Sequence, residues 1–257
     1  YCLDAQSGRK IYTVKTHGHI EAAPTLAGDK LLFSAGGEGF YCVRAEDGKL
    51  LWQTRCGHSD SSAAVAGDRV YVGTAYGDNA VVCLDLNSGR KLWSQPQDLP
   101  VWGHAAVRGD QVVVGLGNGT FGQSDPHPRG AVVALGAGDG RALWRRELPD
   151  SVNTSLVLAG DQILLGCRDG FVYSLGEQEG RIQWKAACGV PMLSSLILQD
   201  KTVLATGGDG HLHALELASG KEFWRYLVSD VPCEASPMLS GNQLFLGCGN
   251  FLECLGP

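Results

Sequence analysis

Histidine is the residue type in this sequence that most directly suggests chemistry. His17 and His19 are separated by one glycine, and His58 and His104 lie in two later segments that we expect to connect strands. Imidazole nitrogens are good ligands for Zn²⁺, Cu²⁺ and Ni²⁺, so these side chains could hold a transition metal. No ligand spacing repeats along the chain, and scattered surface histidines need no metal to explain them. The sequence therefore leaves metal ligands unassigned.

Carboxylates form a second group, because several occupy one position relative to a recurring turn. The position lies eight residues before the Asp or Asn of that turn, and it holds Glu21, Asp60, Trp102, Asn153, Met192 and Glu234. If the chain closes into a ring, the three carboxylates lie in nearby repeats and could bind Ca²⁺. A solvated acidic rim is the alternative, and the pattern favours it. We predict that all six residues lie near the mouth of a channel and contact a ligand or partner.

Two further segments carry side chains suited to recognition. Trp102 and His104, in the sequence VWGH, could form a stacking platform for a planar or sugar-like ligand. Residues 115–131 contain the longest insertion, and long loops in compact domains are often functional. Its contact-capable side chains are Phe121, Asp125, His127 and Arg129. The alternative is that this loop is a flexible insertion with no function.

Several function classes lack support in the sequence. There is no GxSxG nucleophile motif and no GxxxxGK[ST] phosphate loop, so we predict no catalytic residue. The net charge is −6 and no basic run occurs, which excludes the clustered positive surface of a nucleic-acid-binding protein. No apolar stretch approaches the roughly 18 residues of a transmembrane helix.

The elements that must position these residues follow from an internal repeat. A glycine followed four residues later by an aromatic residue closes a short motif six times, at Tyr12, Trp52, Trp93, Trp144, Trp184 and Trp224. The steps between the motif glycines are 40, 41, 51, 40 and 40 residues. A period near 40 with strand-like content predicts a β-propeller.

One repeat, residues 61–93, shows four short apolar runs separated by Gly-Asp, Gly-Asp-Asn and Asn-Ser-Gly turns. Four antiparallel strands in about 40 residues make one propeller blade. The third strand of the pattern occurs seven times and each of the others six times. We therefore predict a single domain over residues 1–257 with seven blades, the first and last incomplete, and with six or eight blades as alternatives.

Two residue types in the repeat have a structural interpretation. We expect each motif Trp to pack between neighbouring blades, and we expect a looser contact where Tyr12 replaces it. Cys2, Cys42, Cys83 and Cys254 share one repeat position, which predicts small packing side chains there. Cys56, Cys188 and Cys233 fall in loops and are better candidates for exposure.

The blade pattern resembles the quinoprotein-type, or PQQ-like, propeller repeat. The resemblance covers essentially the whole chain and is carried by the Gly-Asp turns, by Asp169-Gly170 and Asp209-Gly210, and by the VCLD and VYSL strands. Dehydrogenases of this family are larger, eight-bladed proteins with an adjacent Cys-Cys disulfide, a calcium site and a catalytic Asp. This chain has no adjacent cysteine pair. The resemblance therefore implies the non-catalytic branch, which includes outer-membrane assembly scaffolds.

These observations favour a binding or scaffold propeller that recognises a protein partner through its channel-face loops, without a cofactor. The alternatives are a sensor for a small ligand or cation, a quinone-dependent oxidoreductase using PQQ and Ca²⁺, and an accessory module of a larger chain. The family resemblance implies a periplasmic or otherwise extracytoplasmic location. Nine cysteines without a recognisable disulfide framework leave the cytoplasm as the alternative.

Overall fold

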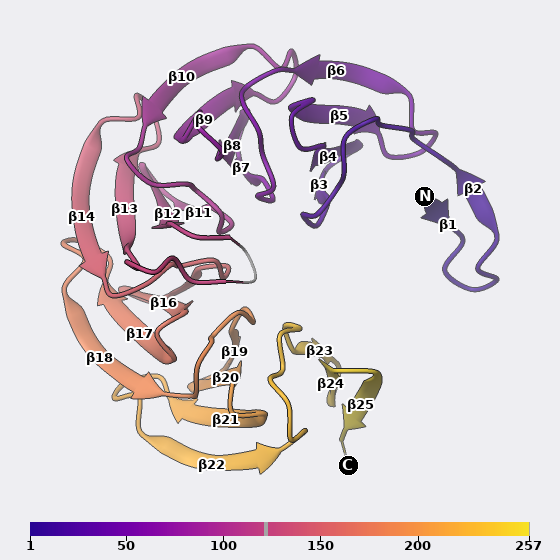
Figure 1. Ribbon diagram of the computed structural model, residues 1–257. Helices are drawn as coiled ribbons and strands as arrows, with labels where there is room; N and C mark the ends of the chain where they lie inside the picture. The colour runs from indigo at the N-terminus through magenta and orange to yellow at the C-terminus, as the bar shows by residue number, and fades with distance from the viewer. Residues whose placement is uncertain (121–122, 257) are drawn as a thin grey trace. The chain divides into compact units, whose positions relative to one another are not determined.

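A computed structural model describes residues 1–120 and 123–256. These residues form 25 strands, β1 to β25, which make seven small sheets (Figure 1). Within each sheet, neighbouring strands are consecutive in the sequence. The chain has an all-β propeller fold. No helical segment with the length and apolar character of a membrane span occurs in the described residues.

The chain divides into two compact units. The first contains Tyr1–Val112 and Gly136–Arg141, and the second contains Val113–Leu135 and Ala142–Pro257. Each unit is a succession of antiparallel meanders whose hairpins have the Gly-rich turns that the sequence predicts. The extent of a single domain over residues 1–257 stays a prediction.

The first unit contains three complete sheets. They are the sheet of β1 (Cys2–Leu3) and β2 (Lys10–Tyr12), the sheet of β3 (Thr25–Ala27), β4 (Lys30–Ser34), β5 (Phe40–Arg44) and β6 (Leu50–Thr54), and the sheet of β7 (Ala64–Ala66), β8 (Arg69–Gly73), β9 (Ala80–Asp85) and β10 (Lys91–Pro96).

The second unit also contains three complete sheets. They are the sheet of β15 (Val157–Ala159), β16 (Gln162–Cys167), β17 (Phe171–Gly176) and β18 (Ile182–Ala187), the sheet of β19 (Ile197–Gln199), β20 (Thr202–Thr206), β21 (His211–Glu216) and β22 (Glu222–Leu227), and the sheet of β23 (Met238–Ser240), β24 (Gln243–Cys248) and β25 (Phe251–Leu255). A seventh sheet, of β11 (Ala106–Arg108), β12 (Gln111–Gly117), β13 (Gly130–Gly136) and β14 (Ala142–Leu148), has residues in both units.

The strand count of the repeat is confirmed. Among the described residues, the third strand of the pattern occurs seven times, from β1 to β25, and the other three strands occur six times each. β1 and β2 are a third and a fourth strand, whereas β23 to β25 are a first, second and third strand. The number of blades in the ring stays a prediction.

The core of each unit lies between adjacent sheets. In the first unit, Leu32, Phe40 and Trp52 pack with Val70 and Val82 of the next sheet. In the second unit, Leu164 and Trp184 pack with Val203 and Leu215. Second and third strands are apolar almost throughout because both of their faces are covered, while the fourth strand is largely exposed, as in β22.

Five of the six motif aromatics bond across to the adjacent sheet, as the repeat predicts, whereas Trp224 is 49% exposed and departs from that expectation. The Trp52 indole Nε1 donates to the Leu86 carbonyl at 3.0 Å, and Trp184 donates in the same way to Leu217 at 2.9 Å. The expectation of a looser contact at Tyr12 is wrong, because its hydroxyl donates to the Ala45 carbonyl at 2.7 Å. Trp93 and Trp144 make the corresponding bonds to Ala137 and Glu177.

The motif glycine has a role that the sequence pattern does not reveal. A Cβ on Gly89 would lie 2.6 Å from the Trp52 ring, and one on Gly220 would lie 2.4 Å from the Trp184 ring. Both glycines also have positive φ. Each of the five motif glycines after Gly8 therefore turns its hairpin and makes room for the aromatic residue of the preceding motif.

The three loop cysteines are buried, so the expectation of exposure is wrong for them. Burial raises the pKa of Cys56 to about 11 and that of Cys188 to about 12, which leaves both thiols protonated. Cys233 forms a disulfide with Cys248 across 15 residues of sequence. The shared packing position is confirmed for Cys42 and Cys83, which are fully buried, but not for Cys2, which is partly exposed, or Cys254, which is exposed.

The turn between β19 and β20 corrects the alignment of one repeat. Asp200 has a φ of 53° and takes the place of the positive-φ glycine, so Lys201 stands where the other copies have Asp or Asn. The residue equivalent to Asp60 and Asn153 is therefore Leu193, and the choice of Met192 is wrong by one position. Both side chains are buried.

Candidate functional site

The segment between β6 and β7, residues 55–63, carries His58 and Asp60 and is bonded to two neighbouring turns. The Ser59 amide donates to the Gly36 carbonyl at 3.2 Å, and the Ala75 amide donates to the His58 carbonyl at 2.9 Å. These bonds fix the segment between two turns, one after β4 and the other after β8. His58 and Asp60 are consequently held on a rigid backbone rather than on a free loop.

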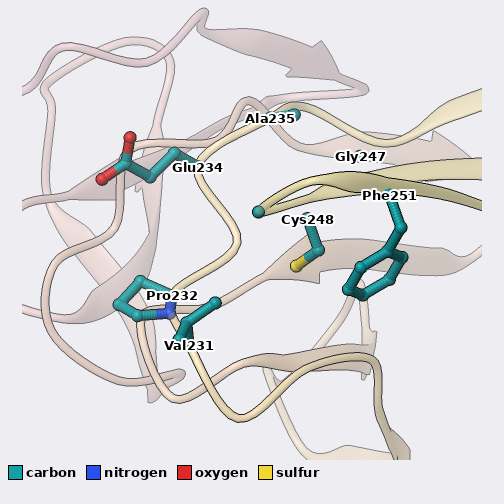
Figure 2. Close-up of a pocket in the computed structure, with 8 residues that line it drawn as sticks. Val231, Pro232, Glu234, Ala235, Gly247, Cys248 and Phe251 are labelled. Carbon is teal, nitrogen blue, oxygen red and sulfur yellow. The ribbon is translucent and has the colours of Figure 1, made fainter.

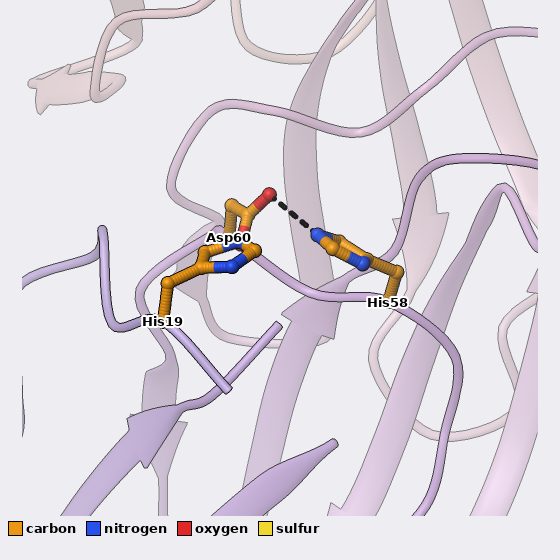
Figure 3. Close-up of side chains that lie close together, drawn as sticks. All are labelled: His19, His58 and Asp60. Carbon is orange, nitrogen blue, oxygen red and sulfur yellow. Dashed lines mark hydrogen bonds and ion pairs between the residues drawn. The ribbon is translucent and has the colours of Figure 1, made fainter. Parts of the chain in front are cut away.

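His19, His58 and Asp60 form the His–Asp cluster (Figure 3). His58 Nε2 lies 2.9 Å from Asp60 Oδ2, and His19 Nε2 lies 3.3 Å from Asp60 Oδ1. The two imidazole rings are 5.3 Å apart between centroids. One ligand atom from each residue lies within 4.8 Å of the other two. The cluster therefore combines two imidazoles and a carboxylate at one point.

Two features of the turn after β4 position His19. The ring of His19 lies against Gly36, where a Cβ would approach it to 3.0 Å, and Gly36 has a φ of 52°. Glu38 Oε2 accepts hydrogen bonds from the His17 and Gly18 amides at 3.0 and 3.1 Å, and from the Tyr41 hydroxyl at 3.0 Å. The bond from Gly18 is the main reason why the pKa of Glu38 falls to about 2.

Asp60 is the buried member of the cluster, with 8% of its side chain exposed. Its Oδ1 atom accepts no hydrogen bond in the described part of the chain, and the same holds for the hydroxyls of Ser59 and Ser62 beside it. Buried polar atoms in folded proteins almost always have a partner. These oxygens therefore have hydrogen-bonding capacity left for water or for a bound group, and His19 Nε2 lies 3.3 Å from Asp60 Oδ1.

An aromatic pair borders the cluster. The Tyr76 ring packs edge-on against His58, with centroids 4.5 Å apart, and against Trp102, with centroids 5.1 Å apart. Tyr76 has a φ of 55° and is 63% exposed, whereas Trp102 is buried. Partial loss of hydration raises the pKa of the Tyr76 hydroxyl, and the nearby Asp60 and Glu21 carboxylates raise it further.

Of the predicted site residues in the first unit, Asp60 and Glu21 lie in or beside the cluster, and the others lie outside it. Asp60 lies in the cluster, and Glu21 lies at its edge with Oε1 3.8 Å from His19 Nε2. Trp102 is covered by its own chain, so Tyr76 is the exposed ring of the platform that VWGH was expected to form. His104 is half-buried, and burial lowers its pKa. His17 is exposed and bonds Glu38 instead of joining His19.

In the second unit, Asn153 stands at the position equivalent to Asp60 and is also buried. Neither its amide nitrogen nor its amide oxygen has a hydrogen-bond partner among the described residues. The neighbouring segment contains Asp150 and Ser151, and Ser151 Oγ donates to the Asn118 carbonyl at 2.6 Å. Arg168 is almost completely buried, and this burial lowers its pKa while Asp150 opposes the shift.

Glu234 lines a pocket of about 510 Å³ beside the last sheet. Figure 2 shows Glu234 on one side of this pocket and Phe251 on the other, with Val231 and Pro232 below. Cys248, which is bonded to Cys233, also lines it. The disulfide therefore ties the segment before β23 to the end of β24.

Hydrogen bonds within the insertion between β12 and β13 connect its described residues. Asn118 accepts from the Arg129 amide at 2.7 Å and donates to the His127 carbonyl at 2.9 Å. Both His127 and Arg129 are exposed at the surface. Phe121, the other predicted contact residue of this loop, lies outside the described residues. The binding role of the predicted site residues in both units stays a prediction.

Sequence reasoning did not identify Tyr76, Gly36 or Glu38. Tyr76 precedes Gly77 in AYGD, but nothing in a single sequence marks it as a residue with positive φ. The GGEG sequence at 36–39 was a usable signal, because paired glycines beside a carboxylate indicate a tight turn that a side chain can approach closely. The contact between His19 and His58 could not be predicted either, because it depends on how two adjacent sheets pack together.

Comparison with known proteins agrees with this architecture. The family model described as outer membrane protein assembly factor BamB matches residues 1–127 and 128–252. BamB of Burkholderia pseudomallei is 26% identical over 188 residues, which are 66% of this chain and 45% of that protein. The quinohemoprotein alcohol dehydrogenase ADH IIB of Pseudomonas putida is 29% identical over 143 residues, or 49% of this chain and 20% of that enzyme.

Solved structures show the same fold at low sequence identity. BamB from Moraxella catarrhalis superposes with a TM-score of 0.74 at 17% identity, over 95% of this chain and 74% of that one. The computationally designed Ika8 protein gives a TM-score of 0.78 at 15% identity, over 97% of this chain and 75% of that one. The chain spans less than half the length of these two curated relatives. It belongs to the PQQ-like propeller family whose model is described as outer membrane protein assembly factor BamB.

Proposed function

We propose that this chain is a non-catalytic binding propeller that recognises a protein partner and serves in the assembly of outer membrane proteins. The observation that carries the proposal is the match to the assembly-factor family, which covers nearly the whole chain in two segments. A fold alone does not fix a function, so the loops must supply the recognition. The two curated BamB relatives support the same role.

Tyr76 is the side chain that we assign to the contact in the first unit. It is exposed, and it is held from two sides by His58 and Trp102. Rigid aromatic side chains contribute large contact area with little loss of entropy, and they dominate many interfaces. The buried Trp102 supports the ring rather than touching the partner. In the second unit, His127 and Arg129 of the insertion are the proposed contacts.

The proposed location is extracytoplasmic. The assembly-factor relatives suggest it, and the Cys233–Cys248 disulfide supports it because such bonds persist in oxidising compartments. In this proposal the chain needs no quinone or calcium ion for its function.

The test is a genetic complementation experiment. The gene is deleted in its host, and the amount of folded outer membrane protein is measured after complementation with wild type, with Tyr76→Asn, or with Leu26→Asn. Asn tolerates positive φ, so the first variant removes the ring while keeping the turn. Leu26 is an equally exposed apolar side chain on β3 and serves as the control.

We expect wild type and Leu26→Asn to restore outer membrane protein levels and Tyr76→Asn to fail, with all three proteins present at equal amounts. Full rescue by Tyr76→Asn would remove the assigned contact. No change of outer membrane proteins on deletion would remove the assembly role itself.

The relationship to a quinohemoprotein dehydrogenase defines the second candidate, a quinone-dependent oxidoreductase. It is tested by adding PQQ and Ca²⁺ to the purified full-length protein and following dye reduction with a panel of alcohols. Turnover that depends on both additions would replace the scaffold proposal.

A further inference from the structure

We propose that the His–Asp cluster of His19, His58 and Asp60 binds a divalent transition-metal ion of the Zn²⁺ class. This goes beyond the proposed partner recognition and does not depend on it. The cluster brings together residues from segments before β3 and β7, which are 41 positions apart at their outer members. The ligands are one nitrogen from each imidazole and one carboxylate oxygen of Asp60.

The distances suit such an ion. Zinc–ligand bonds of about 2.0–2.1 Å in a tetrahedral site place neighbouring donor atoms roughly 3.3 Å apart. His19 Nε2 and Asp60 Oδ1 are separated by 3.3 Å, and His58 Nε2 and Asp60 Oδ2 by 2.9 Å. One donor atom from each of the three side chains lies within 4.8 Å of the other two, which is close to the spacing that a single ion requires.

Burial of Asp60 is an independent reason to expect a cation. A carboxylate that is nine-tenths buried loses most of its hydration, and this loss is unfavourable unless other groups replace it. The Oδ1 atom has no hydrogen-bond donor in the described part of the chain, although it faces the exposed His19 ring. A metal ion at this point would complete the coordination of that atom.

The ligand types select the class of metal. Two imidazole nitrogens favour Zn²⁺, Ni²⁺ or Cu²⁺, whereas Ca²⁺ and Mg²⁺ prefer sites made only of oxygen atoms. The Ca²⁺ that the acidic positions suggested is thus the less suitable ion for this cluster. Glu21 lies at the edge as a further carboxylate, and His19 is 52% exposed, so a fourth position is open to water or to Glu21.

The site is also preorganised. Gly36 gives the His19 ring its place, and Glu38 holds the His17 and Gly18 backbone that leads to it. His58 is fixed by the backbone bonds of its own segment and by the Tyr76 ring. Ligands that are already in place lose little entropy when an ion binds, which raises affinity.

The experiment is a Zn²⁺ titration of the purified chain against a chromophoric chelator, after treatment with EDTA. A Cys2→Ser/Cys254→Ser background is used, because Cys254 is exposed and Cys2 is partly exposed. The variants are His19→Gln, Asp60→Asn and His17→Gln. The last is the matched control, because His17 is exposed on the same segment but is not in the cluster.

We expect one Zn²⁺ per chain in the background protein, with affinity reduced at least about tenfold by His19→Gln and by Asp60→Asn and unchanged by His17→Gln. Co²⁺ should give the visible absorption of a four-coordinate ion, and this band should be absent in His19→Gln. Circular dichroism checks folding, and His19→Gln keeps the test decisive if Asp60→Asn unfolds, since His19 lies at the surface. No saturable binding, or equal binding by His19→Gln and His17→Gln, would overturn the proposal.

Discussion

The segments 55–63 of the first unit and 150–155 of the second have the same backbone design and different chemistry. In the first, Ser61 Oγ donates to the Gly73 carbonyl and accepts from the Gly73 amide. In the second, Thr154 makes the same two bonds with Gly166. The residue before each hydroxyl is buried, but it is Asp60 in one case and Asn153 in the other.

The difference shows that the repeat fixes where a side chain lies, whereas the loop residues decide what it can bind. Asp60 is accompanied by His58 and His19 and forms a cluster of metal-ligand type. Asn153 has no ionisable side chain, and Ser151 stands two residues before it where His58 stands in the first unit. One common design therefore supports a candidate cation site in one unit and an uncharged buried amide in the other.

The largest expected effect is the loss of stability on removing a buried motif Trp, and it tests whether these Trp residues stabilise both units equally. Trp52→Ala and Trp184→Ala should each lower the free energy of unfolding by about 3–5 kcal/mol, because each removes a buried indole and leaves a cavity against a motif glycine. Urea unfolding followed by circular dichroism measures both. The exposed Leu26→Ala serves as the control and should change stability by less than about 0.5 kcal/mol. A clearly smaller loss for one Trp would show that the two contacts are not equivalent.

The hydroxyl bonds come next in size. Ser61→Ala and Thr154→Val should each cost about 1–3 kcal/mol, because the buried amide of Gly73 or Gly166 loses its acceptor. Thermal unfolding of the two variants measures the effect. Ser61→Ala should also weaken Zn²⁺ binding, because the bond between Ser61 and Gly73 supports the segment that carries His58 and Asp60. Thr154→Val should leave Zn²⁺ binding unchanged. Losses below about 0.5 kcal/mol at both positions would contradict the shared design.

Glu38 gives a pH-dependent test of the support for His19. The pKa of this carboxyl falls from its ordinary value of 4.5 to about 2, chiefly because the Gly18 amide donates to it. Its contribution to stability is therefore complete above pH 4.5 and is lost as the pH falls towards 2. The stability difference between wild type and Glu38→Gln, measured by urea unfolding at several pH values, should shrink over this interval. A difference that stays constant would show that the carboxylate is not the stabilising form.

The smallest effect concerns the turn between the first two strands of a sheet, compared between β7–β8 in the first unit and β19–β20 in the second. Asp200 has positive φ where Gly67 stands in the first unit. Asp200→Gly should raise the free energy of unfolding by up to about 1 kcal/mol, and Gly67→Asp should lower it by a similar amount. Melting temperatures of both variants measure this pair. Destabilisation by Asp200→Gly would indicate that the aspartate side chain has a role of its own.

The sequence by itself was enough for the fold, because the same strands, turns and closing aromatic residue recur along the chain, mostly at a period of about 40 residues. Those signals are local, and the strand count, the motif aromatics and the buried Cys42 and Cys83 positions follow from them. The one misaligned turn arose because Asp200 adopts a backbone conformation that a glycine usually supplies. The residue type Asp does not by itself indicate that the backbone has a positive φ at that position.

The candidate site could be predicted only in part from the sequence. The sequence indicated His19, His58, Asp60 and Glu21 as separate possibilities, and only tertiary structure decided that the first three share one point while Glu21 stays at the edge. It also decided that Trp102 is covered and Tyr76 exposed. The physical reason is that periodicity places a residue on a loop, whereas side-chain proximity depends on how adjacent sheets pack and on which glycines allow close approach.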